Sequence, residues 1–212
     1  MFRFIISTIL FSLFFLTLSF PQEYGHRYSD IYYAGIPADE FENFVTPQLD
    51  NYWCWAASAQ MVFNYYGIEV SQKEIVKWIY DYDENGYLPD KGVSLKTLNY
   101  LLNISGYDTL GTYFEVKSIM GKGAPIPAKL IEELSNKKPV IVGYATPEGG
   151  HVVVVTGVKY KITEIGPKIL GFIVRDPMPD QTFSLHNGVI EYPGKSFAKK
   201  INAYWLISIK KF

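Results

Sequence analysis

The sequence predicts an α+β fold in which helices from the first part of the chain pack on a largely antiparallel sheet from the last part. Residues with helical spacing dominate up to residue 138, and runs rich in β-branched residues follow from residue 139 onward. This order, helices before strands, is typical of α+β folds. The chain has 212 residues, of which 48% are hydrophobic, so it can bury the core of one sizeable domain.

The first predicted helix begins close to a cysteine. Apolar residues recur at i, i+4, i+7 and i+11 from Trp55 to Tyr66, and a glycine follows as a stop. Asp50 and Asn51 are the candidate N-caps. This places Cys54 in the first turn of the helix or just before it.

Three further helices have start signals of their own. Ser71 and Glu74 form a capping-box pattern before IVKWIY. Ser94 precedes LKTLNYLLN, and Pro127 opens AKLIEELSNKK, where proline suits the first helical position.

Four β-rich runs follow and are separated by turn residues. In chain order they are PVIVGYA, HVVVVTGV, ILGFIVRD and NAYWLISIK. The segment TPEGG between the first two predicts a hairpin. Trp205 lies in the last run, where we expect it in the core.

The N-terminus predicts export. Residues 1–20 contain Arg3 and then an apolar run from Phe4 to Phe20, as in a secretory signal peptide. An uncleaved N-terminal membrane anchor is the alternative, because the run is long enough to span a bilayer. Residues 21–46 form an N-terminal extension that can be an arm, a short pro-region or a tether. We expect the functional domain at residues 47–212, in a secreted, periplasmic or cell-surface protein.

The charge balance excludes some partners. With 20 basic and 21 acidic residues the net charge is −1, which provides no field to attract nucleic acid or anionic lipid. We therefore expect no nucleic acid and no membrane contact beyond the signal peptide or anchor. We also expect no cofactor. A metal site using the cysteine and histidines is a weak alternative, since no close ligand pair such as H-E-x-x-H occurs.

Cys54 is the only cysteine of the chain and lies between Trp53 and Trp55. An exported chain with one thiol forms no internal disulfide, and the simplest interpretation is a buried thiol acting as a small hydrophobe. A helix N-terminus or a neighbouring imidazolium instead favours the thiolate, which is the nucleophile. Trp55 is expected to anchor the helix in the core, whereas Trp53 either shields the thiol or lines the cleft.

His151 is the best candidate for a base. It follows two glycines and opens a valine run, which combines a rigid strand with open surroundings. The alternative is an ordinary surface histidine at the start of a strand. The other two histidines, His26 and His186, lie in a predicted irregular arm and a predicted turn.

Two further residues complete the pattern. Asp176 ends the strand expected to pair with that of His151, and can orient the imidazole; it can equally be a turn aspartate. Asp180 is a weaker candidate for this role. Gln48, six positions before Cys54, can donate to an oxyanion together with the Cys54 backbone N–H.

These motifs together resemble papain-like cysteine peptidases. In chain order they are Q-x5-C-W at 48–55, G-H-V-V-V-V at 150–155 and D-P at 176–177. Papain and the cathepsins also carry an aromatic residue directly after their catalytic cysteine. The second and third motifs resemble the peptidases that process double-glycine leaders of bacteriocins, and NYWCWAAS resembles papain-like effector proteases of bacteria. The resemblance implies a papain-like fold with a Cys–His–Asp site and an oxyanion glutamine.

The chain also departs from papain. The C-G-[SA] before the catalytic cysteine is replaced by residues 51–53, and the orienting residue is Asp rather than Asn. Cys54 and His151 lie 97 positions apart (151 minus 54), closer than in papain. The specificity of papain is therefore not carried over.

The predicted function is an exported cysteine peptidase that hydrolyses peptide bonds of a polypeptide substrate through a Cys54 thioester. His151 is the expected base and Asp176 the orienting residue. Two alternatives remain: a catalytically inactive papain-like binding module, and a transpeptidase or amidase that uses the same site. The sequence does not give the oligomeric state.

Overall fold

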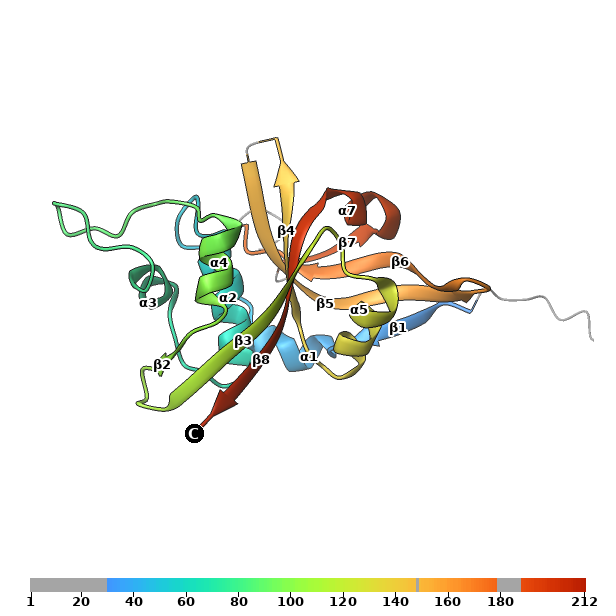
Figure 1. The fold of residues 1–212 in the computed structure, drawn as a ribbon, viewed down its shortest axis with the longest axis horizontal. Coiled ribbons are helices and arrows are strands. Elements are labelled where there is room, and N and C mark those ends of the chain that lie inside the picture. Colours follow the sequence, from blue (N-terminus) through green and yellow to red (C-terminus); the bar gives the residue numbers. More distant parts are fainter. Residues whose placement is uncertain (1–29, 148, 179–187) are drawn as a thin grey trace, which may run out of the picture.

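The structure is a computed structural model that describes residues 30–147, 149–178 and 188–212 (Figure 1). Its strands are β1 (Tyr32–Gly35), β2 (Ser105–Tyr107), β3 (Tyr113–Lys122), β4 (Val140–Thr146), β5 (Gly149–Thr163), β6 (Gly166–Arg175), β7 (Val189–Pro193) and β8 (Ile201–Lys211). Its helices are α1 (Ala38–Phe41), a 3-10 turn (Glu42–Phe44), α2 (Cys54–Tyr65), α3 (Gln72–Lys77), α4 (Leu95–Leu101), α5 (Pro127–Ser135) and α7 (Gly194–Lys200).

The sheet is antiparallel throughout and has the order β2-β3-β8-β4-β5-β6-β7. The long strand β5 organises it. Along one edge β5 pairs first with β4 and then with β1, and along the other edge it pairs with β6. The prediction of helices packed on a C-terminal antiparallel sheet is confirmed.

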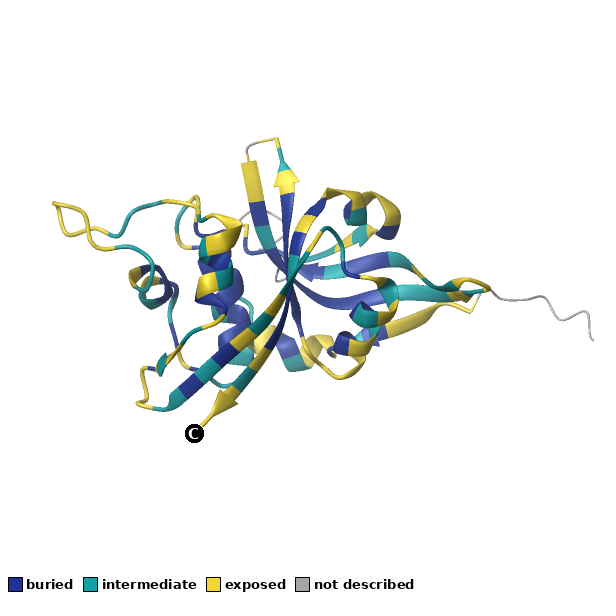
Figure 2. Cartoon of the chain, viewed as in Figure 1, coloured by how far each residue is buried: buried dark blue, intermediate teal, exposed yellow. Residues whose placement is uncertain are grey.

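Helices cover both faces of the sheet and bury two cores. Figure 1 shows α2, α3 and α4 at one end and α5 and α7 at the other. The larger core lies under α2 and α4 and contains Trp55, Phe63 and Trp205, each at most 1% exposed. The second core lies on the side of α5 and α7 and contains Phe172 and Phe197. Figure 2 shows buried positions along the central strands and on α2. Trp55 and Trp205 are therefore core residues, as predicted.

The predicted start residues of the later helices are confirmed. Ser71 and Glu74 make the reciprocal hydrogen bonds of a capping box, Ser94 caps α4, and Pro127 opens α5. Gly67 follows the C-terminal end of α2 and has a φ of +77°, a conformation that favours glycine. The pairing of Thr146 with Gly149 confirms the hairpin between β4 and β5.

The predicted N-cap of α2 is wrong. Neither Asp50 nor Asn51 caps this helix; Trp53 is the N-cap and makes no side-chain cap hydrogen bond. The reason is a turn before the helix, in which the backbone N–H of Trp53 donates to the carbonyl of Asp50 at 3.3 Å. The turn places both polar residues too early to reach the first amides.

Residues 30–46 pack on the body as an arm. β1 adds to β5, and the backbone N–H of Ile36 donates to Thr156 O at 2.9 Å. Ile36 and Phe41 are at most 2% exposed in the larger core. The predicted signal peptide, residues 1–20, lies outside the described residues. Among the residues described, none of the helices is long and apolar enough to cross a bilayer.

Candidate active site

Cys54 is the first residue of α2 and is 8% exposed. The side chain of its N-cap forms no cap. The first backbone amides of the helix are thus not occupied by a capping side chain, and they point to the end where a helix favours negative charge. Cys54 therefore lies where both a thiolate and an oxyanion find favourable electrostatics.

The turn before Cys54 is held by buried amides. Gln48 is 6% exposed, and its Nε2 donates to the carbonyls of Asp50 at 2.9 Å and Asn51 at 2.7 Å. Its Oε1 is buried without a hydrogen-bond partner. Gln72 supports the same turn, accepting from Leu49 N at 2.9 Å. The oxyanion role of Gln48 stays a prediction, because both amide hydrogens are engaged within the turn.

A strap at residues 89–91 holds the same turn from outside. The carboxylate of Asp90 accepts from Asn51 Nδ2 at 2.8 Å and from Tyr52 N at 2.7 Å. The indole N–H groups of Trp53 and Trp55 donate to the carbonyls of Pro89 and Lys91, both at 3.1 Å. Trp53 is 3% exposed, so it serves the core and the strap rather than lining the cleft.

His151 lies near the start of β5, where the strand packs against α2. The hydroxyl of Ser58 in α2 donates to Val152 O at 3.0 Å and so ties the cysteine helix to the histidine strand. Tyr144 is paired with His151 across β4 and β5, and the two rings are perpendicular with centroids 5.6 Å apart. The imidazole is thereby fixed by a neighbouring strand and by an aromatic wall.

Asp176 directly follows β6, the strand next to that of His151, close to the strand end where it was predicted. Its Oδ1 accepts from His151 Nε2 at 2.7 Å and from Met178 N at 2.9 Å. Asp176 is 6% exposed and His151 is 7% exposed. Because Nε2 is bound to the carboxylate, the other ring nitrogen is the one left for Cys54, whose side chain is also hydrogen-bonded to the imidazole.

These contacts raise the pKa of His151. Burial of the imidazole lowers its pKa, while the hydrogen bonds to Asp176 and Cys54 raise it by more, and the pKa of His151 rises to about 10. Burial and the hydrogen bond to Tyr192 raise the pKa of Tyr144, with smaller contributions from Asp176 and Cys54. At neutral pH the imidazole of His151 is therefore held in its protonated form beside Cys54.

The three side chains line one cleft of about 620 Å³. Its remaining walls come from the turn before Cys54 and α2, residues 92–94 with α4, the β4–β5 pair, the segment after β6, β7 and β8. They are Asn51, Tyr52, Trp55, Gly92, Val93, Ser94, Leu95, Leu98, Gly143, Tyr144, Thr146, Gly150, Val152, Met178, Ile190, Tyr192 and Asn202. Gly143 leaves room in the cleft, since a Cβ there would lie 3.7 Å from Trp205 and 3.8 Å from Leu95.

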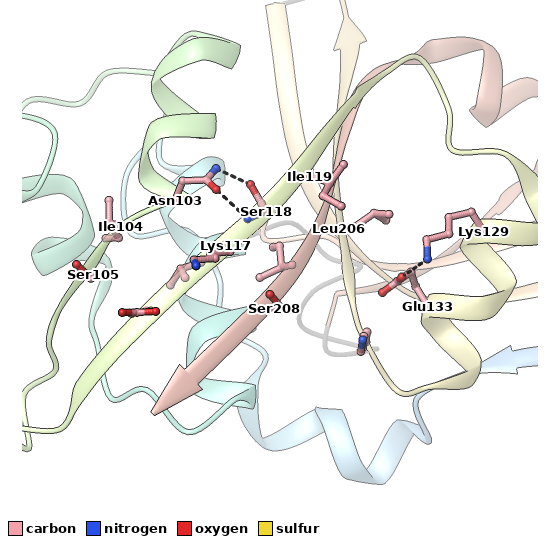
Figure 3. A pocket seen from close by; sticks show the side chains of 14 residues that line it. Asn103, Ile104, Ser105, Lys117, Ser118, Ile119, Lys129, Glu133, Leu206 and Ser208 are labelled. Carbon is pink, nitrogen blue, oxygen red and sulfur yellow. Dashed lines mark hydrogen bonds and ion pairs between the residues drawn. The ribbon is translucent and has the colours of Figure 1, made fainter. Parts of the chain in front are cut away.

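A second groove, of about 740 Å³, lies over β3 and β8 and beside α5 (Figure 3). Figure 3 shows two pairs within it: Lys129 with Glu133 at 2.9 Å, and Asn103 with Ser118. The groove contains none of the predicted site residues. Its lysines and glutamates offer no nucleophile paired with a base.

Two cleft residues were missed by sequence reasoning. Tyr144 was indistinguishable from the core residues of its strand. Asn202 lies where the pairing of β4 with β8 shifts register, from Gly143↔Ala203 to Tyr144↔Ile201. This bulge leaves Asn202 exposed at the cleft, and bulges recur beside active sites. Only the pairing of two strands 60 residues apart reveals it.

Asp180, His26 and His186 lie outside the described residues. Within the described ranges, no three His, Cys, Asp or Glu side chains gather as metal ligands would.

Comparisons with known proteins identify the family. Two solved structures resemble the chain: the peptidase domain of Streptococcus ComA, a bi-functional ABC transporter involved in a quorum-sensing pathway, and that of Streptococcus mutans ComA. The first is 19% identical, covers 77% of this chain and 96% of that chain, and has a TM-score of 0.49. The second is 16% identical, covers 77% and 98%, and has a TM-score of 0.43. A search of curated proteins finds no match. The model of the peptidase C39-like family matches residues 42–208, so the chain belongs to this family, which confirms its resemblance to the compact bacterial branches of the papain-like superfamily.

Proposed function

We propose that the protein is an exported cysteine peptidase that hydrolyses peptide bonds through a thioester on Cys54. The hydrogen-bonded series Cys54–His151–Asp176, lining one cleft, carries this proposal. Membership of the peptidase C39-like family supports it and implies a polypeptide substrate. The N-terminal run supports export, with retention as an anchor as the alternative.

The proposed mechanism uses these side chains in turn. The Cys54 thiolate attacks the peptide carbonyl carbon, and the Cys54 N–H stabilises the oxyanion, with Gln48 as the predicted second donor. The His151 imidazolium gives its proton to the leaving amine as the C–N bond breaks, which leaves a thioester and a neutral imidazole. The imidazole then takes a proton from water, whose oxygen attacks the thioester. Collapse releases the carboxylic acid and restores the thiolate–imidazolium pair, while Asp176 keeps the ring oriented throughout.

Alkylation tests the nucleophile directly. The purified protein should react with iodoacetamide at Cys54 faster than a free thiol at mildly acidic pH, and His151→Gln should remove this excess rate. Labelling that requires denaturant would show a buried, inert thiol and overturn the proposal. A peptide-library cleavage profile with Cys54→Ala as control then separates a peptidase from an inactive binding module. Added amines that accept the acyl group would reveal a transpeptidase.

The oxyanion role of Gln48 has a matched control. Both Gln48 and Gln72 hold the turn before Cys54, but only Gln48 lies within the Q-x5-C motif. If Gln48 donates to the oxyanion, Gln48→Ala should lower kcat about 100-fold or more. Gln72→Ala should have a much smaller effect. Equal losses in the two variants would show that Gln48 acts only through the turn.

A further inference from the structure

The tip of the β5–β6 hairpin exposes apolar side chains that the proposed catalysis does not use. Ile165 in its turn is 100% exposed and Ile162 is 62% exposed. Beside them β1 brings Ile31, 58% exposed, and Tyr32, whose ring stacks on Tyr160 at 5.5 Å. A single exposed isoleucine is ordinary, but several gathered at one end of a domain mark an interaction surface.

The same tip carries two neighbouring lysines. Lys161 and Lys168 are direct partners across β5 and β6, an arrangement of like charges that disfavours strand pairing. In the described part of the chain neither lysine has an ion pair. Glu164 in the turn and Asp30 beside Ile31 supply two opposing charges, so the tip has no net charge. Contact of the two lysines with anionic headgroups would relieve their mutual repulsion locally, without a net attraction of the tip.

The described part of the chain begins at the same end of the molecule. Its first residue is Asp30, two residues before Tyr32, which is held against Tyr160 of β5. Nine residues, 21–29, separate Asp30 from Phe20, the last residue of the apolar run. Nine residues reach at most about 30 Å. A retained run would therefore keep this tip within about 30 Å of the bilayer that it enters.

We propose that this tip, comprising Ile31, Tyr32, Ile162 and Ile165 with the two lysines, rests on the lipid bilayer in which the uncleaved N-terminal run is anchored. Isoleucines and tyrosine suit the boundary between headgroups and acyl chains, and lysines suit anionic headgroups. The net charge of −1 gives the whole protein no attraction to such a surface, so the contact depends on the tether. The proposal does not depend on the catalytic assignment.

The arrangement sets the height of the cleft above the membrane. His151 lies at the opposite end of β5 from the tip, which begins after Thr163. Twelve residues of strand extend about 40 Å. The cleft would therefore act on polypeptides in the aqueous phase well outside the headgroups, rather than on segments buried in lipid.

Lipid quenching tests the contact. The full chain is reconstituted through its N-terminal run into vesicles of brominated anionic phospholipid, as the variant Ile165→Trp. The matched control is Leu110→Trp, since Leu110 is 76% exposed in the turn between β2 and β3, at the far end of the molecule in Figure 1. The signal is the fluorescence of the introduced tryptophan, taken as the difference from the unsubstituted chain. We expect the brominated lipid to quench it in Ile165→Trp and not in Leu110→Trp. Adding Ile162→Ser and Lys161→Gln should reduce the quenching.

Equal quenching at positions 165 and 110, or none at 165, would overturn the proposal. So would cleavage of the N-terminal run in the native membrane that releases a chain with no affinity for vesicles. All variants should retain the wild-type kcat/KM on soluble peptides, because no tip residue lines the cleft. A failure of peptidase activity in the unsubstituted chain would thus concern the proposed function and not the membrane contact.

Discussion

Replacing Asp176 by asparagine removes one negative charge while keeping the hydrogen-bond geometry. An asparagine Oδ1 can still accept from the imidazole N–H and from Met178 N, as the carboxylate oxygen does now. The ring of His151 should stay in place. What changes is the electrostatic stabilisation of its protonated form.

The size of the effect follows from the pKa of His151. It rises from the ordinary value of 6.5 to about 10, which is a difference of about 3.5 (10 minus 6.5). At 1.36 kcal/mol per pKa unit this corresponds to about 5 kcal/mol in favour of the imidazolium, against the opposing cost of burial. Asp176 and Cys54 share this effect, so removing the carboxylate charge should lower the pKa of His151 by about 1 to 2 units.

The assay is the pH dependence of kcat/KM on a cleaved peptide. Its alkaline limb marks the loss of the His151 proton that the leaving amine requires. Asp176→Asn should move this limb to lower pH by about 1 to 2 units. Asp108→Asn is the control, because Asp108 is also 7% exposed and accepts backbone N–H groups, but does not line the cleft. An alkaline limb that stays in place in Asp176→Asn would refute the electrostatic role of Asp176.

The same shift predicts a pH-dependent stability, best measured in Cys54→Ala, where only the carboxylate faces the imidazole. A pKa raised in the folded state stabilises that state below the unfolded value of about 6.5 and loses the contribution as the pH rises through the folded value. The free energy of unfolding of Cys54→Ala should therefore decline as the pH rises above 6.5. The double variant with Asp176→Asn should show a smaller decline, and equal declines would contradict the reasoning.

Three further substitutions test how the site is held. Asp90→Ala removes the hydrogen bonds that hold the turn before Cys54. It should lower kcat/KM about tenfold or more, because a small displacement of the nucleophile slows the reaction strongly. Unfolding curves should change little, and an unchanged kcat/KM would contradict the role of the strap. Ser58→Ala leaves the carbonyl of Val152 without its donor, and chemical denaturation should show a loss of about 1 to 3 kcal/mol. Ile36→Ala opens a cavity where the arm enters the core and should cost about 2 to 5 kcal/mol by the same measurement; a loss below 1 kcal/mol would show that the arm is dispensable.

Local sequence signals were sufficient to predict the helices that begin with a capping residue or a proline. The capping box at Ser71, the N-cap at Ser94 and the proline at 127 act through neighbouring backbone groups, so they are readable without tertiary structure. β3 was not predicted because its residues, YFEVKSIMGK, are only partly buried and lack a clear alternation. Its long pairing with β8, which the sequence does not reveal, stabilises this strand. β1 and β7 are short and also depend on their neighbours.

Chemical type and order were sufficient to select the candidate site. Cys54, His151 and Asp176 were singled out as a rare thiol, a histidine opening a rigid strand, and an aspartate at the end of the next strand, and the structure brings all three together. The strap at Asp90 was not predictable, since a lone exposed-looking aspartate 36 residues downstream of the cysteine carries no local signal. The role of Gln48 is the least determined, because the motif suggests an oxyanion donor while its hydrogen bonds lie within the turn.

The backbone joins the parts of the site more directly than the side chains do. The N–H of Gln48 donates to Pro177 O at 2.7 Å, which links the segment before the nucleophile to the segment that carries Asp176. The N–H of Asp176 in turn donates to Gly188 O at 2.8 Å. Motion of either segment would therefore change both the oxyanion side and the orienting side of the cleft. This coupling ties the geometry between Cys54 and His151 to the segment of Gln48 and to the segment that follows β6.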